Sequence, residues 1–304
     1  MKLILYSLLF AGALPLSLYA EDSGESPLSW SGNLGAGAEQ HSNVSVTEIE
    51  STTGEADSAI LFEAGLDASW ALSERFTLDA GYSFSDRRFN QFSEFDLRMH
   101  LAYLDLSYEA GDYSFGANHY YADALVDSND FLTLNQSSLY VARFIGSQVY
   151  LRAALNQVRK NFSQLTERSA DSQGLSTNIF WFSTDVQRFL SLGLSYTDED
   201  ANNNEFSYQA WGSRLRLSQR FQLFSRDARM QLSGSWEERD YEGVTTLLSE
   251  ARQDTQLLAE ANFEVALNQR LSLVAELERG RFRSNLAIAD YAETRAGLGL
   301  RLDF

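Results

Sequence analysis

The side chains that most often carry acid–base chemistry are sparse in this 304-residue chain. It contains three histidines and no cysteine, so a disulfide framework and a thiolate metal site are both excluded. His41 stands near a polar stretch, whereas His100 and His119 lie in two neighbouring segments of alternating polarity. Neither of these two has a serine two residues later with which it could form a His-x-Ser catalytic pair on one strand face. The chain also contains no Asp-x-His sequence, which would place a carboxylate beside a histidine. Acid–base catalysis at these histidines is therefore disfavoured, and no catalytic residue is predicted.

One acidic run, Asp198-Glu199-Asp200-Ala201-Asn202, has the spacing of calcium ligands. However, Asn203 stands where an EF-hand loop needs glycine, and Gln209 stands where it needs the closing glutamate. The run therefore predicts a solvated acidic loop, and no metal or other cofactor is expected. Two basic pairs, Arg87-Arg88 and Arg159-Lys160, could bridge lipopolysaccharide phosphates, although most such pairs are simply solvated.

The remaining candidates are charged residues that alternate with apolar ones. Between Ala292 and Phe304 the even positions are apolar or small, and the odd positions are charged or glycine. A period of two indicates a strand with one apolar and one polar face. On the polar faces of such strands we expect these carboxylates: Glu63, Asp67, Asp79, Asp105, Glu260, Glu264, Glu276, Glu278, Glu293 and Asp303. The same faces are predicted to carry four arginines: Arg143, Arg152, Arg295 and Arg301.

About fourteen segments of roughly 10–13 residues show this alternation, which is the length that crosses a bilayer at a tilt. No proline follows Pro27, as expected of strands paired on both sides. Short polar connections, expected on the periplasmic side, alternate with longer ones. The predicted long connections include 41–58, 122–133, 158–174 and 238–254, and one periplasmic turn, 218–227, is unusually long. The sequence thus predicts an all-β, transmembrane, antiparallel up-and-down β-barrel of about fourteen strands, with twelve to sixteen possible, over residues 28–304.

The N-terminus is typical of an exported protein. Lys2 precedes an apolar run over residues 3–14, and small Ala20 stands at the expected cleavage position. Residues 1–20 are therefore predicted to be a signal peptide, and 21–27 a short periplasmic segment. The formal net charge of −18 disfavours nucleic acid as a partner. No later apolar run of about 18 residues occurs, so helical membrane spans are excluded.

The chain ends in Gly297-Leu298-Gly299-Leu300-Arg301-Leu302-Asp303-Phe304. A final aromatic residue that closes an alternating strand resembles the insertion signal of bacterial outer-membrane proteins, with Gly299, Leu302 and Phe304 at the matching positions. The resemblance implies recognition by the barrel-assembly machinery and a location in the bacterial outer membrane. In size the chain resembles the monomeric fourteen-stranded porins. The known barrel enzymes pair His-x-Ser or use Asp-x-His, and both motifs are missing, so the chain is not expected to be an enzyme.

Two functions follow from this architecture. Side chains alone cannot fill a fourteen-stranded barrel, and inward carboxylates favour cations, which together predict a passive, weakly cation-selective pore for small hydrophilic solutes. The same carboxylates could instead pair with the arginines and brace the wall. The alternative is a non-conducting barrel that serves as an assembly, export or surface-display partner, its lumen closed by loops such as 158–174. Expected contacts are outer-membrane lipid, lipopolysaccharide, the barrel-assembly machinery and small solutes.

Overall fold

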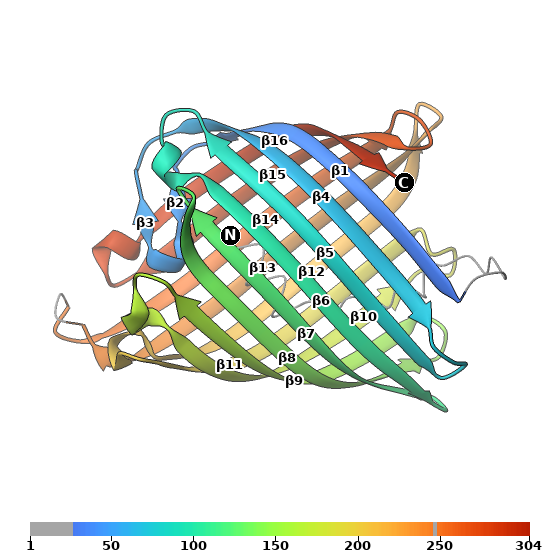
Figure 1. The fold of residues 1–304 in the computed structure, drawn as a ribbon, viewed down its shortest axis with the longest axis horizontal. Helices are drawn as coiled ribbons and strands as arrows, with labels where there is room; N and C mark the ends of the chain where they lie inside the picture. Colours follow the sequence, from blue (N-terminus) through green and yellow to red (C-terminus); the bar gives the residue numbers. More distant parts are fainter. Residues whose placement is uncertain (1–26, 246–247) are drawn as a thin grey trace.

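The structure, a computed structural model, describes residues 27–245 and 248–304. Fourteen antiparallel strands form one closed barrel in which each strand pairs with the next along the chain, and β16 pairs back with β1 (Figure 1). The prediction of an up-and-down barrel of about fourteen strands is confirmed. The predicted signal peptide, residues 1–20, and most of the segment 21–27 lie outside the described residues. The barrel strands are β1 (Leu28–His41), β4 (Asp57–Ala71), β5 (Phe76–Phe89), β6 (Leu97–Ala110), β7 (Tyr113–Val126), β8 (Asn129–Ile145), β9 (Val149–Phe162), β10 (Ala170–Phe182), β11 (Arg188–Ala201), β12 (Tyr208–Leu223), β13 (Arg226–Val244), β14 (Ala251–Ala266), β15 (Leu271–Ser284) and β16 (Tyr291–Asp303).

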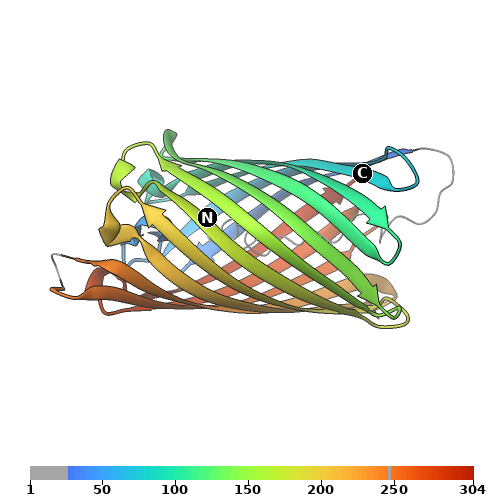
Figure 2. The same ribbon diagram turned by 90° about the horizontal axis from the view of Figure 1, so that it is seen from below.

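The outer wall of the barrel is apolar because successive side chains of a strand point to opposite faces. On β4, for example, Ile60, Phe62 and Leu66 are each about half exposed on this wall. Apolar side chains exposed in this number belong in a hydrocarbon solvent, where every backbone polar group must be paired internally. The closed ladder of tilted strands meets that requirement (Figure 2). Within the described residues, no helix has the length and apolarity needed to cross a membrane.

Several strands run further than the alternation predicts, so some predicted connections are wrong in length. Residues 122–133 are the ends of β7 and β8 around a turn at Asp127-Ser128, and only 163–169 connect β9 to β10. β13 reaches Val244 and β14 starts at Ala251, which shortens the predicted loop 238–254. Beyond the bilayer the outward side chains can be polar, so the hydrophobic alternation stops although the backbone pairing continues.

The predicted long periplasmic turn, 218–227, is also wrong in length. β12 and β13 are joined by Phe224-Ser225 alone, with φ values of 49° and 63°. Two consecutive positive φ angles are the geometry of a type I′ hairpin turn, which matches the twist of the flanking strands. Such turns usually carry asparagine, aspartate or glycine, and this one carries none of them, so its sequence gives no turn signal.

The barrel closes where β1 meets β16, with Asn33 opposite Asp303 and His41 opposite Arg295. Phe304 continues this seam, because its backbone N–H and C=O both bond to Gly32, at 2.9 and 2.8 Å. A Cβ on Gly299 would lie 2.9 Å from the carbonyl oxygen of Ala36 in the facing strand. The glycine and the aromatic residue of the C-terminal pattern therefore both fit the seam tightly.

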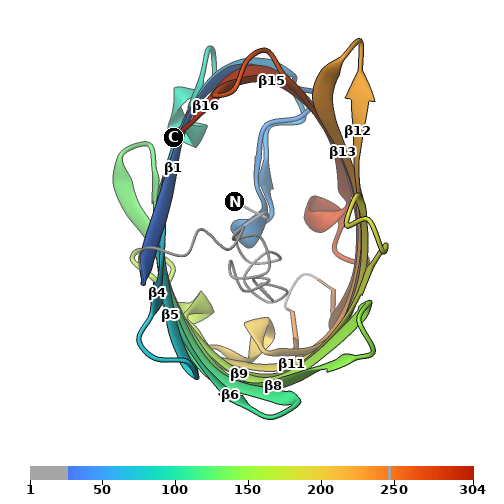
Figure 3. The same cartoon turned by 90° about the vertical axis from the view of Figure 1, so that its right-hand side faces the viewer.

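The two ends of the barrel differ in their connections. Short turns gather at the end that holds the C-terminus, which is the periplasmic side in outer-membrane barrels. At the opposite, outer end, the connection 42–56 folds into the interior, where Figure 3 shows it in blue inside the ring of strands. It contains the two-residue strands β2 (Ser45–Val46) and β3 (Ser51–Thr52). The 3-10 helices of this end are η2 (Thr47–Ile49), η3 (Ser93–Phe95), η4 (Thr166–Arg168), η5 (Asn204–Phe206) and η6 (Ala287–Ala289).

Candidate functional site

The carboxylates that the sequence places in the lumen lie on the inner face of the wall. Asp79, Asp105 and Glu278 are buried there, on strands whose neighbouring outward residues are exposed. The strand registers put these further predicted residues on the same inner face: Glu63, Asp67, Glu260, Glu264, Glu276, Glu293, Asp303, Arg152, Arg295 and Arg301. Their proposed effect on ions stays a prediction, because it depends on which of them are free.

Many of the predicted lumen carboxylates are paired with an inward arginine or accept a hydrogen bond from a tyrosine hydroxyl. The ion pairs include Glu278 with Arg295 at 2.8 Å, Glu260 with Arg214 at 3.0 Å and Glu264 with Arg229 at 2.6 Å. Two tyrosine hydroxyls donate to Asp67 and Asp105, at 2.9 and 2.7 Å. Glu63 and Glu276 take part in no ion pair within the described ranges. The inner charges therefore brace neighbouring strands more than they form an open ring of carboxylates.

Arg143 differs from the expectation, because its side chain lies on the outer wall. It shares this face of β8 with the exposed residues Val141 and Ile145. Its Nη1 donates to the hydroxyl of Tyr113 at 3.0 Å, and its guanidinium lies 4.9 Å from the centre of that ring. Close to the periplasmic rim, an outward arginine can cover apolar surface with its stem and reach water with its head. Alternation alone cannot place such a residue.

Several inward arginines were missing from the predicted set, most clearly Arg214 and Arg216 on β12. Arg214 is 5% exposed and pairs with Glu260. Arg216 follows it on the same face, has an unpartnered buried Nε and makes no ion pair among the residues that the structure describes. The sequence carried a signal for both, because Arg214 and Arg216 alternate with Leu215 and Leu217.

A cluster around Glu39 holds the base of the inward connection. Glu39 is 5% exposed and accepts from Arg87 Nε at 2.6 Å. His41 lies 3.0 Å from the same carboxylate, and Arg295 lies 3.7 Å from it. Three strands, β1, β5 and β16, thus meet where β1 passes into residues 42–56. Of the basic pair Arg87-Arg88, one member faces inward, while Arg88 pairs on the outside with Asp86 at 2.7 Å.

The connection 42–56 is a folded hairpin. Val44 is completely buried, and its backbone N–H and C=O bond to Glu55 and Thr53. The amide oxygen of Asn43 accepts from the Thr52 hydroxyl at 2.6 Å and from the Gly54 N–H at 2.9 Å. Gly54 has a φ of 72°, which suits a residue without a Cβ. These bonds give the segment a fixed shape inside the barrel.

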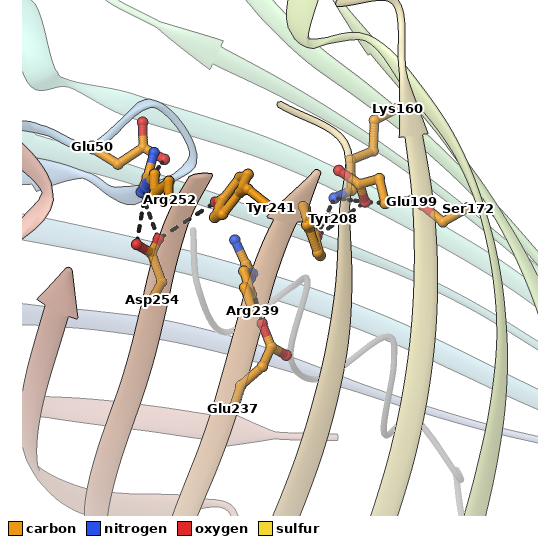
Figure 4. Close-up of polar contacts among 10 residues, drawn as sticks. All are labelled: Glu50, Lys160, Ser172, Glu199, Tyr208, Glu237, Arg239, Tyr241, Arg252 and Asp254. Atoms are coloured by element: carbon orange, nitrogen blue, oxygen red, sulfur yellow. Dashed lines mark hydrogen bonds and ion pairs between the residues drawn. The ribbon is translucent and has the colours of Figure 1, made fainter. Parts of the chain in front are cut away.

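The tip of this hairpin is anchored on the far side of the barrel by Glu50. Its carboxylate pairs with Arg168 of η4 at 2.8 Å and with Arg252 of β14 at 3.0 Å. Arg252 also pairs with Asp254 at 2.6 Å, so one guanidinium joins the segment to the wall (Figure 4). On the near side, the Ser45 hydroxyl donates to Glu293 at 2.5 Å. The segment therefore spans the outer end of the lumen between two polar attachments.

The wall beside Glu50 combines cationic and aromatic side chains on the inner faces of β9 to β14 (Figure 4). Arg239 pairs with Glu237 at 2.6 Å and lies 4.7 Å from the ring centre of Tyr208. Arg252 lies at the same distance from the ring centre of Tyr241. Cations over aromatic faces at this range are attracted by the ring quadrupole.

The centre of this wall is a buried ion pair between Lys160 and Glu199. The hydroxyls of Ser172 and Tyr208 donate to the same carboxylate, at 2.9 and 3.0 Å. Glu199 belongs to the acidic run with calcium-like spacing. Because consecutive side chains of β11 point to opposite faces, the neighbouring carboxylates of this run do not converge on one ion. No group of three or more candidate metal ligands occurs in residues 27–245 and 248–304.

The other histidines lie on the outer wall. His100 Nδ1 is 2.7 Å from the Tyr82 hydroxyl, and His119 Nδ1 is 2.9 Å from the Ser137 hydroxyl. A histidine beside a serine is the start of a nucleophilic pair, but such a base needs a third group to orient it. Within the described part of the chain, the Nε2 atom of His119 makes no hydrogen bond. The arrangement satisfies two polar side chains and provides no complete catalytic set.

Comparison with known proteins places this barrel in a family. The anion-selective porin of Comamonas acidovorans superposes with a TM-score of 0.53 at 11% identity, covering 92% of this chain and 100% of that one. OmpT of Vibrio cholerae, in its trimer form, superposes with a TM-score of 0.55 at 10% identity, covering 91% and 99%. At such identities the similarity shows the barrel fold alone, and no curated protein matches significantly in sequence. A family model described as surface lipoprotein assembly modifier matches residues 30–292, so the chain belongs to this family of bacterial outer-membrane barrels.

Proposed function

We propose that this barrel serves in the assembly or display of surface lipoproteins, as a partner protein and not as an enzyme. The observation that carries the proposal is the hairpin 42–56, held across the outer end of the lumen by Glu50. The description of the matching family supports the same function. Of the two functions that the sequence left open, this is the non-conducting alternative. In this proposal the closing element is the connection after β1, and residues 158–174 contribute Arg168, which pairs with Glu50.

The energetics of the anchor support a hairpin that stays across the lumen at rest. The side chains of Glu50 and Arg252 are 14% and 6% exposed. Removing one partner of a buried ion pair costs about 3–5 kcal/mol, because the other charge is left without compensation. In the proposed function the anchor keeps the hairpin across the lumen until a specific client displaces it.

The cellular test is protease accessibility of surface lipoproteins in intact cells. Cells that lack the protein should keep their lipoproteins in the membrane but lose protease cleavage of them at the surface. The wild-type gene should restore cleavage. A folded variant whose hairpin is crosslinked to the wall should fail to restore it. Unchanged surface exposure in the deletion strain would contradict the proposal.

A passive, weakly cation-selective pore for small hydrophilic solutes is the second candidate, favoured by inward carboxylates such as Glu63 and Glu276, which take part in no ion pair within the described residues. Free inward carboxylates attract cations. Single-channel recording of the refolded barrel under a salt gradient separates the two candidates. Stable open steps with a cation-favouring reversal potential, weakened by Glu63→Gln and Glu276→Gln, would support the pore. A folded barrel that passes no current supports the closed lumen.

Contacts with lipopolysaccharide and with the barrel-assembly machinery stay predictions. Arg159 pairs with Asp171 at 2.8 Å, and both side chains are well exposed on the outer wall. The neighbouring Lys160 faces inward, so the pair Arg159-Lys160 offers a single cation to a phosphate outside. The residues of the predicted assembly signal, Gly299, Leu302 and Phe304, lie at or next to the seam between β1 and β16.

A further inference from the structure

The wall that receives Glu50 contains one carboxylate fewer than it has cations. Its cationic side chains are Lys160, Arg168, Arg239 and Arg252. Its own carboxylates are Glu199, Glu237 and Asp254, each paired with one of these cations. Glu50 supplies the fourth carboxylate, and it is the only one that pairs with Arg168 among the described residues. The charge balance of the wall therefore depends on a carboxylate brought by a separate segment.

The segment that brings it has the character of a bound peptide. Residues 47–50 read Thr-Glu-Ile-Glu, and Thr47, Glu48 and Glu50 line a cleft against the wall. The backbone carbonyl of Glu48 accepts from Arg168 Nη1 at 3.2 Å. Ile49 packs against the apolar cluster formed by Leu97, Ala124, Leu132 and Phe162. One acidic side chain and one apolar side chain of the same short segment are thus recognised at once.

We infer that this wall is a binding site for an acidic segment of a client polypeptide, and that residues 47–50 occupy it in the absence of the client. The inference rests on the proposed function, since the client is then the lipoprotein chain. A carboxylate of the client pairs with Arg168 and Arg252 in place of Glu50, and an adjacent apolar side chain takes the place of Ile49. Binding of the client and release of the hairpin are then one event.

The inner face of β12 extends the site toward the periplasm. It carries Tyr208 at the wall and Arg216 further along the same face, and the Arg216 guanidinium makes no ion pair in the described residues. Eight residues of a strand separate these two side chains, about 26 Å at 3.3 Å per residue. An extended client segment with a second carboxylate can therefore meet a second cation on its way to the wall.

The hairpin 42–56 competes with any added peptide for the wall, and this competition sets the conditions of the test. A short tether gives the hairpin an effective concentration of about millimolar at its own site, so added peptide at micromolar concentration cannot displace it in the wild-type protein. Glu50→Gln removes the charge that Arg168 and Arg252 bind but leaves the wall intact. The site should then accept the same charge from solution.

The experiment measures binding of a fluorescent synthetic peptide with the sequence of residues 45–52, Ser-Val-Thr-Glu-Ile-Glu-Ser-Thr, to the refolded full barrel. Binding to Glu50→Gln should be at least about tenfold tighter than to the wild type. The gain should vanish in Glu50→Gln/Arg168→Gln, and a peptide with glutamine at the position of Glu50 should not bind. Glu55→Gln, an exposed carboxylate in the same hairpin, is the matched control and should behave as the wild type.

Equal binding of the peptide to Glu50→Gln and to the wild type would overturn the inference. So would equal binding of the glutamine peptide, or displacement of the bound peptide by inorganic phosphate at the same concentration. Heat-modifiable mobility on gels verifies that each variant is folded. The peptide assay contains no lipoprotein, so a negative result contradicts the binding site without contradicting the proposed function in surface display. Conversely, loss of surface display in the deletion strain supports the proposed function but does not by itself show that the wall binds an acidic segment.

Discussion

Loosening of the hairpin by Glu50→Gln is the change whose size can be worked out most directly from the structure. Breaking a buried ion pair costs about 3–5 kcal/mol, and the lower end applies because Arg252 keeps its pair with Asp254. A loss of about 3 kcal/mol raises the population of the released hairpin about a hundredfold, at 1.4 kcal/mol per factor of ten. The expected result is a large gain in solvent access at the base of the hairpin.

Thiol labelling can measure this gain because the chain has no native cysteine. Val44 is completely buried, so Val44→Cys should react slowly with a maleimide, at a rate set by the population of the released hairpin. Adding Glu50→Gln should raise the labelling rate about a hundredfold, whereas adding Glu55→Gln should leave it unchanged. Equal labelling rates with and without Glu50→Gln would refute the reasoning, because the ion pairs would then not hold the segment.

Two further changes test the seam and the inner wall. Gly299→Ala should lower the free energy of unfolding in liposomes, measured by urea titration, by about 1–3 kcal/mol, because the new Cβ meets the facing backbone at 2.9 Å. Gly297→Ala, whose nearest contact is at 3.5 Å, should be nearly neutral. Similar midpoints for both variants would contradict the tight seam. Arg214→Gln should cost about 3 kcal/mol in the same assay, since it removes the ion pair of the buried Arg214 with Glu260. Arg216→Gln, which breaks no ion pair within the described residues, should cost less than about 1 kcal/mol. A larger loss for Arg216→Gln would show that the assigned pairing is wrong.

The membrane-spanning part of the fold could be predicted from the sequence because two solvents act on each strand. Hydrocarbon outside and polar groups inside force a period of two, as on β4, where Ile60 and Phe62 face out and Glu63 faces in. Outside the bilayer this constraint ends. Asp127-Ser128 therefore looked like the middle of a long polar loop, although it is a tight turn between two paired strands.

The candidate site was harder to predict, because its contacts join residues that are far apart in sequence. Glu50 meets Arg168 and Arg252 only after the barrel has closed, and no local pattern couples these positions. Arg214 and Arg216 could have been found from their alternation with leucine. Arg143 could not, since an arginine at the rim can lie on either face and still reach water.

The central proposal is that the barrel serves in the assembly or display of lipoproteins at the outer surface, and reconstitution tests it most directly. The refolded protein is placed in liposomes with a purified client lipoprotein supplied on the side of the short turns, and protease is added on the opposite side. The account predicts that the client is cleaved only when the barrel is present, and that crosslinking the hairpin to the wall abolishes cleavage. A client that stays protected with a folded, uncrosslinked barrel would contradict the claim.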